Sequence, residues 1–198
     1  MSPTSSAASK GAAFSLLLSL LLLSGCGGDD SRTAPEEAEQ SQEAMAFSVD
    51  SDLLGELVRQ PELSISLRPP AGWEESATPT DSELPVRVLE FFQGAGPSYL
   101  LIGSIETEET AEAMAETLAH SEDQLATFSH HDLLFHQVRR VTEDRVTFSL
   151  LFDHPPEFAP VGLVQYTIPL DEIEYRARLV ESSIGSIQPM GASKSGTE

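Results

Sequence analysis

The densest group of side chains that could do chemistry is His130-His131-Asp132, with His136 shortly after it. On one extended strand, His130, Asp132 and His136 would share a face, because side chains at even spacings point the same way. His154 could reach them from the end of a neighbouring strand. Imidazole and carboxylate ligands suit zinc or another divalent transition metal. The pattern allows a metal-binding protein or a metal-dependent enzyme, but no His-Glu-x-x-His motif accompanies it, and half-exposed structural histidines are the simpler interpretation.

The single cysteine, Cys26, is the second chemically distinctive residue. It follows an apolar run from Ala12 to Leu23 and the two small residues Ser24 and Gly25, and Lys10 precedes the run. The run is shorter than the roughly 20 residues that a membrane-spanning helix needs. A basic start, a short apolar core and small residues at its end are typical of a secretory signal peptide.

Leu23-Ser24-Gly25-Cys26 resembles the lipobox of bacterial lipoproteins. The resemblance implies that residues 1–25 are removed and that Cys26 receives a diacylglyceryl group and an acyl chain, with no other cofactor. Two or three acyl chains anchor a protein firmly without crossing the bilayer. The resemblance therefore implies a lipid-anchored protein of the bacterial cell envelope. Because Gly27 rather than Asp follows Cys26, the outer membrane facing the periplasm is favoured if the host is Gram-negative.

The chain is strongly acidic, with 32 Asp and Glu against 11 Lys and Arg and a formal net charge of −21. Removing residues 1–25 takes away Lys10 alone and leaves about −22. Proteins bind nucleic acid through Lys and Arg, so this charge disfavours nucleic acid as a partner. The acidity fits solubility or a salt-adapted host, and alternatively a surface that attracts cations or a basic partner.

Composition divides the mature chain into three parts. Residues 26–45 are polar, acidic and poor in aromatic residues, which is typical of a flexible tether. Residues 46–189 have the length of one globular domain, and residues 190–198 form a small polar tail. With Cys26 modified, no disulfide and no cysteine-based metal site is available to the domain.

Hydrophobic patterning predicts the elements of the domain. A short helix is expected from Asp50 or Ser51 until Pro61 stops it, and a second helix from an N-cap at Thr107 to Ala119. A last helix starts at Pro169-Leu170-Asp171-Glu172 and carries an apolar seam up to Ile187. Strands are expected at Leu63–Leu67, Val86–Phe92, Ser98–Ile105, Leu133–Val141, Arg145–Phe152 and Val161–Ile168.

Hairpin-linked strands with helices before, between and after them predict an α+β domain, a mostly antiparallel sheet covered by helices. Pro70-Ala71-Gly72-Trp73, Tyr166-Thr167-Ile168-Pro169 and the helix with Glu181-Ser182-Ser183-Ile184-Gly185-Ser186-Ile187 occur in an order that resembles the PsbP-like family. The resemblance covers about Leu63 to Gln188 and implies an α/β/α sandwich. It also implies a binding or assembly module, and it carries over no catalytic motif.

Two aromatic residues are weaker candidates for ligand or partner contact. Trp73 stands beside two prolines, where it either forms a ligand platform or anchors a loop to the core. Phe158 lies in a proline-rich loop that could dock a partner or only hold a turn. The sequence thus predicts a non-enzymatic envelope protein that binds or assembles with a protein partner. The alternatives are the histidine metal site and a carrier of lipid or small ligands with a pocket between sheet and helices; the partner and the oligomeric state stay open.

Overall fold

The computed structural model describes residues 47–77, 86–153 and 160–190. Seven strands pair in the order β3-β4-β5-β9-β8-β7-β6, and every neighbouring pair is antiparallel. A second sheet has the order β1-β2-β10. The large sheet comprises β3 (Glu74–Glu75), β4 (Val86–Gln93), β5 (Tyr99–Ile105), β6 (Gln124–His130), β7 (Leu133–Val141), β8 (Arg145–Phe152) and β9 (Val161–Pro169). The small sheet comprises β1 (Val58–Gln60), β2 (Ile65–Leu67) and β10 (Gln188–Pro189).

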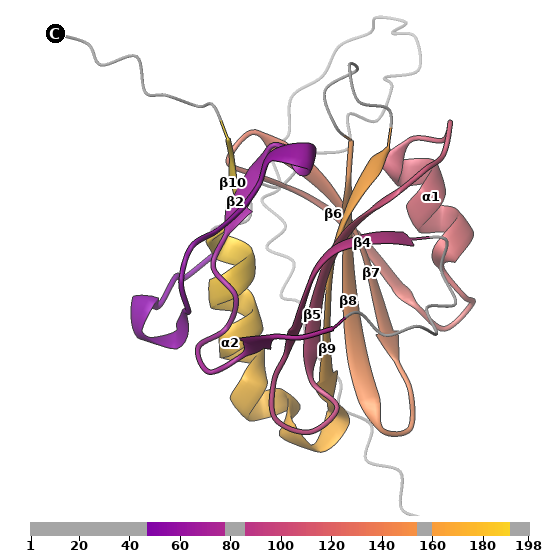
Figure 1. Cartoon of the computed structure of the whole chain (residues 1–198). Helices are drawn as coiled ribbons and strands as arrows, with labels where there is room; N and C mark the ends of the chain where they lie inside the picture. The colour runs from indigo at the N-terminus through magenta and orange to yellow at the C-terminus, as the bar shows by residue number, and fades with distance from the viewer. Residues whose placement is uncertain (1–46, 78–85, 154–159, 191–198) are drawn as a thin grey trace, which may run out of the picture. The chain divides into compact units, whose positions relative to one another are not determined.

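Helices cover both faces of the large sheet (Figure 1). Helix α1 (Ala111–Leu118) packs over β7 and β8 on one face, and α2 (Ile173–Gly185) lies with the small sheet on the other. Three short 3-10 turns are η1 (Ser51–Leu53), η2 (Pro61–Leu63) and η3 (Leu170–Glu172). The described residues therefore form three layers, with the large sheet in the middle.

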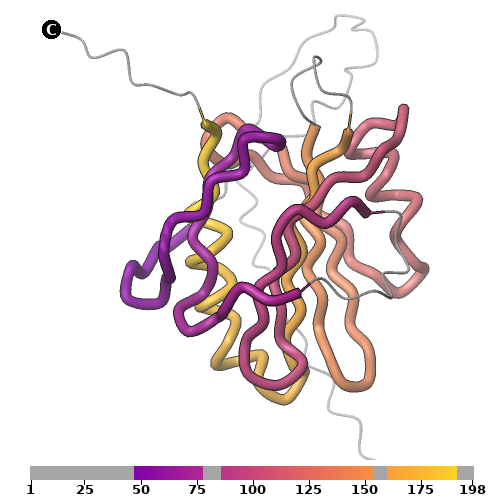
Figure 2. The backbone as a smooth tube through the Cα atoms, viewed as in Figure 1, coloured from indigo at the N-terminus to yellow at the C-terminus, as the bar shows by residue number. Residues whose placement is uncertain are grey.

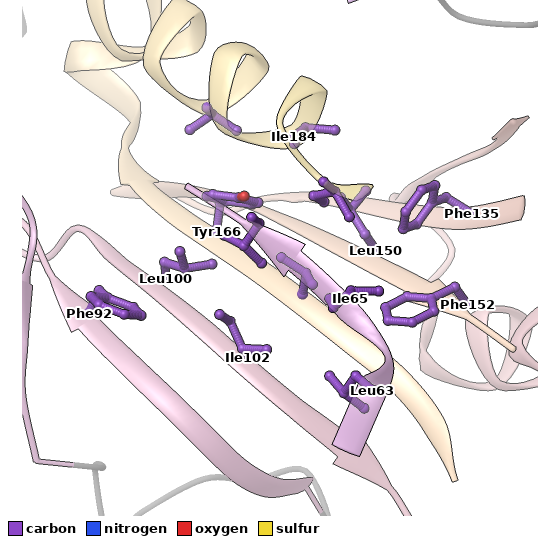
Figure 3. Packing of buried hydrophobic residues seen from close by; sticks show 14 of the residues in the cluster. Leu63, Ile65, Phe92, Leu100, Ile102, Phe135, Leu150, Phe152, Tyr166 and Ile184 are labelled. Atoms are coloured by element: carbon purple, nitrogen blue, oxygen red, sulfur yellow. The ribbon is translucent and has the colours of Figure 1, made fainter. Parts of the chain in front are cut away.

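Alternation along the strands divides the buried side chains into two cores, one on each face. On β8, Val146, Leu150 and Phe152 face α2, whereas Leu151 faces α1. Figure 3 shows the α2-side core, where Tyr166 and Leu150 lie beneath Ile184 of the helix. Leu63 of η2 and Ile65 of β2 belong to the same core. On the other face, Ala111 and Ala115 are small enough to let α1 approach the sheet closely.

Tight hairpins join β4 to β5, β6 to β7 and β7 to β8. The β4–β5 and β7–β8 turns lie at the same end of the sheet (Figure 2), where Leu170 of η3 donates its amide to the Asp144 carbonyl. Gly162 of β9 faces Phe152 of β8 so closely that a Cβ atom would collide with the phenyl ring. This glycine is therefore required by packing between central strands.

The structure confirms the α+β class and the mostly antiparallel sheet covered by helices. The expected strands at Leu133–Val141 and Arg145–Phe152 have the observed bounds, and those at Val86, Ser98 and Val161 are correct within one residue at each end. The expected signal peptide and tether lie outside the described residues.

Other elements differ from the expectations. The helix after Asp50 is only η1, because Leu54 pairs with Pro70 and Gly55 donates to the Pro69 carbonyl, which turns the chain into β1 instead. Helix α1 is capped by Thr110, whose hydroxyl accepts from the Ala113 amide at 3.2 Å, and not by Thr107. The expected strand at Leu63–Leu67 is only β2, because Leu63 belongs to η2 and Ser64 is left-handed, and β6 was not expected.

Candidate functional site

The histidine cluster lies at a hairpin turn and not on one strand. β6 ends at His130, His131 and Asp132 form a two-residue turn, and β7 starts at Leu133. Both turn residues are left-handed, with φ of 47° and 64°, the geometry of the two-residue turns that match the twist of antiparallel strands. The expectation that His130, Asp132 and His136 share a face was therefore wrong, because the chain reverses between them.

The two strand histidines lie on opposite faces of the sheet. His130 points to the same face as Phe128, two residues before it, which belongs to the α2-side core. His136 points to the same face as Val138, two residues after it, which belongs to the α1-side core. His130 Nε2 donates to the Gly185 carbonyl at 3.0 Å. His136 Nδ1 lies 3.3 Å from the Thr127 hydroxyl.

Each of these histidines has structural partners of its own. The His130 ring meets Phe47 edge-on, with centroids 5.0 Å apart, and burial lowers its pKa below the usual 6.5. His131 packs against His130 at 4.1 Å between ring centroids. Among residues 47–77, 86–153 and 160–190, no three His, Cys, Asp or Glu side chains form a group able to hold a metal ion. His154 lies outside these ranges.

Trp73 anchors a loop. Its indole covers Gly94 of the β4–β5 turn so closely that a Cβ there would lie 2.7 Å from the ring, and it packs against the α2-side core. Phe158 is outside the described residues.

A shallow cavity of about 310 Å³ opens at the turn end of β4 and β5. Phe91 and Tyr99 provide its aromatic lining, and the Tyr99 hydroxyl accepts a hydrogen bond from Gln165 at 2.9 Å. The volume is at the lower limit for a small-molecule site. It lies on the α1 face of the sheet, whereas the expected carrier pocket was between sheet and helices, where side chains of both cores pack.

The serine side chains of α2 attach this helix to the large sheet and to segments that precede the sheet in the chain. Tyr166 and Ser183 are fully buried, and their hydroxyls lie 2.9 Å apart. Ser183 Oγ then donates to the Arg68 carbonyl at 2.6 Å. Ser182 Oγ accepts from the Asp50 amide. Burial raises the pKa of the Tyr166 phenol, so it stays protonated as a donor.

An ion pair joins the end of α1 to the sheet. Arg140 of β7 holds the Asp123 carboxylate at 2.7 Å and donates to the Leu118 carbonyl at 2.8 Å. The Asp123 side chain is 5% exposed, and the hydrogen bond from Arg140 lowers its pKa. This pair fixes the loop that leads into β6.

The two edges of the large sheet differ. β3 is two residues long and both are glutamates, and its neighbour β4 has an irregularity between Val88 and Glu90. Short, charged and bulged edges resist pairing with other strands. β6 is seven residues long, pairs with β7 in unbroken register, and contains no charged residue and no proline. We name the outer side of Gln124–His130 the β6 edge.

Comparison with known structures fits this architecture. The chain is similar to cyanobacterial PsbP (CyanoP) from Synechocystis sp. PCC 6803, with a TM-score of 0.50 and 10% identity over 68% of this chain and 91% of that one. The fold is PsbP-like. The Ran-binding protein Mog1p of Saccharomyces cerevisiae matches with a TM-score of 0.44 and 10% identity, over 71% of this chain and 98% of that one. No protein-family model and no curated protein matches.

Sequence reasoning missed the β6 edge for a physical reason. Only Phe128 of this strand is buried, so period-two hydrophobicity, which marks a half-buried strand, is absent. The available signal was the short segment before His131-Asp132 and its β-branched and aromatic residues. In the described part of the chain, no helix is both long and apolar enough to cross a membrane.

Proposed function

We propose that this protein is a lipid-anchored module of the bacterial cell envelope that binds or assembles with a protein partner and performs no catalysis. The observation that carries the proposal is the place of Cys26, the one cysteine, directly after a short apolar core and two small residues. A thiolate is the nucleophile that such lipid attachment requires. The outer membrane facing the periplasm is the proposed location in a Gram-negative host.

The PsbP-like fold supports the binding role only as a scaffold, since one fold carries many functions. The hydrogen-bonded side chains described above give separate support. Ser183, Tyr166, Asp123 and Arg140 each form a hydrogen bond within the chain that fixes a helix or a loop, so each has a structural role. We therefore assign the binding role to the surface of the domain.

The anchor is tested by fractionation of cells that express the full chain or its Cys26→Ser variant. The parent should sediment with membranes and start at Cys26, with the added mass of a diacylglyceryl group and an acyl chain. Cys26→Ser should keep its Met1 end or become soluble. The matched control Ser24→Ala keeps the thiol and a small residue before it, so it should fractionate as the parent does. A parent chain that keeps its Met1 end, or a Cys26→Ser chain that loses its Met1 end and still sediments with membranes as the parent does, would overturn the anchor.

The binding role is tested by crosslinking in intact envelopes, followed by mass determination of the complexes. We expect the parent chain to form a stoichiometric crosslinked adduct with one envelope protein. Recovery of uncrosslinked chain alone, from membranes that contain it, would overturn the binding role.

A further inference from the structure

We propose that the β6 edge binds an extended segment of a partner protein with basic residues at both of its ends, which adds a strand to the large sheet. This inference rests on the proposed binding role and goes beyond it by giving the docking surface and the chemistry of the partner. It does not depend on the lipid anchor.

The backbone groups that point outward from the β6 edge follow from the hairpin turn. A two-residue turn makes His130 and Leu133 a hydrogen-bonded pair, and such pairs alternate with non-bonded ones along an antiparallel ladder. Leu125, Thr127 and Ser129 are therefore in non-bonded positions. Their N–H and C=O groups point away from β7, and an added strand would pair with them.

Exposure agrees with an open edge. Gln124 to Thr127 are four consecutive exposed residues, and Leu125 keeps 52% of its surface accessible. Exposed residues on both faces mean that neither helix layer covers this half of the strand. Seven residues at about 3.3 Å each give a strand of roughly 23 Å. That length suits recognition of an extended peptide.

Charge at the two ends of the edge specifies the partner. Glu122 precedes β6 and Asp132 follows it; both are exposed, and within the described residues neither forms an ion pair. The two arginines of β7, the strand next to β6, are already engaged: Arg140 holds Asp123, and Arg139 bonds Gln124 and lies over Phe148. A segment with Arg or Lys at both ends places opposite charges at these positions.

A second copy of this chain fits the edge less well. Antiparallel pairing of β6 with itself, centred on Thr127, would bring Glu122 of one copy toward Asp132 of the other at both ends. Like charges placed opposite each other on paired strands are destabilising. The net charge of −21 on each chain adds to this repulsion. We therefore assign the edge to a different, basic partner.

The test uses a synthetic eleven-residue peptide of alternating threonine and valine with arginine at each end, which spans the distance from Glu122 to Asp132, and a control peptide with glutamate at each end. Both are added to the full chain in detergent, and backbone hydrogen exchange of Gln124–His130 is measured by mass spectrometry. At ten times its Kd, the arginine peptide should slow exchange in this segment by about tenfold. The glutamate peptide should leave it unchanged.

Two variants place the contact on the edge. Thr127→Pro removes an outward N–H and should abolish binding, whereas Thr127→Val loses the same hydroxyl, keeps the N–H and should bind as the parent does. The double change Glu122→Gln with Asp132→Asn leaves the backbone intact and should weaken the arginine peptide roughly 3- to 10-fold. This pair of charge changes decides the question even if Thr127→Pro does not fold.

Several results would overturn the inference. One is that millimolar arginine peptide does not slow hydrogen exchange in Gln124–His130, and another is that both peptides slow it equally. A third is slow exchange at Leu125, Thr127 and Ser129 in the free chain, which would mean that another segment of the same chain occupies the edge. A dimer in sedimentation that Thr127→Pro dissolves would assign the edge to a second copy. A failed crosslinking experiment overturns the binding role itself, whereas peptide failure with a crosslinked partner present overturns only the β6 edge.

Discussion

The buried hydroxyl chain from Tyr166 through Ser183 to the Arg68 carbonyl allows a prediction about the order of three variants. Tyr166→Phe removes the phenol oxygen but leaves Ser183 Oγ able to donate to Arg68 over 2.6 Å. The cost is one net hydrogen bond, about 0.5–1.5 kcal/mol. Ser183→Ala instead leaves the fully buried phenol without its partner and removes the 2.6 Å bond to the Arg68 carbonyl, which keeps only the longer 3.4 Å bond from the Ser186 hydroxyl; this costs about 2–3 kcal/mol.

The double variant separates this reasoning from simple loss of contacts. With both Tyr166→Phe and Ser183→Ala, no buried hydroxyl is left unpaired, so the second change should recover about 1 kcal/mol relative to Ser183→Ala alone. Urea unfolding followed by the fluorescence of the single tryptophan, Trp73, gives the three free energies of unfolding. If Tyr166→Phe costs as much as Ser183→Ala, or if the double variant equals the sum of the two, the argument is refuted.

Three further perturbations follow from the packing and the ion pair. Gly162→Ala should cost about 1–3 kcal/mol in the free energy of unfolding, because the new methyl group meets the Phe152 ring. Asp123→Asn should destabilise the protein above pH 3.8, and the difference from the parent should shrink as the pH falls through the lowered pKa of Asp123. His130→Phe should flatten the loss of stability below pH 6.5, where the unfolded chain takes up a proton before the buried imidazole does.

Each of these has its own control. Phe152→Leu added to Gly162→Ala should relieve part of the cost, and strict additivity would contradict the collision. For Asp123→Asn, a difference from the parent that stays constant across pH 3.8 would contradict a lowered pKa. For His130→Phe, the slope of stability against pH should be unchanged above pH 6.5 and smaller below it; an identical slope below would show that His130 titrates normally.

The sequence predicted the strands that are rich in apolar residues. β7 and β8 carry apolar residues at neighbouring positions because they pack against the cores on both faces of the sheet, and their predicted bounds are those observed. β6 was missed because only Phe128 of that strand is buried. An exposed edge strand carries no hydrophobic period, so the feature that hid it from sequence reasoning is the same one that leaves its backbone open.

The errors came from contacts between residues distant in sequence. Leu53, Leu54, Leu57 and Val58 fit a helical face, but the amide of Gly55 bonds to Pro69, and no local propensity encodes that pairing. At α1 both Thr107 and Thr110 are possible caps. The Asp153 carboxylate accepts the Ala111 amide at 2.8 Å across 42 residues, which helps to fix the start after Thr110.

The expectation that His130, Asp132 and His136 share one strand face failed in the same way. Even spacing implies a shared face only within one strand, and the left-handed pair His131-Asp132 ends β6 and reverses the chain. His130 then binds the end of α2 while His136 lies under the α1 layer. The residues that looked reactive in sequence thus build the hairpin, and by setting its two-residue turn they also fix which amides of β6 point outward. A change of turn length by one residue would shift the register of β6 on β7 and turn a different set of amides outward, so the turn sets the backbone geometry of the β6 edge that we propose as the docking surface.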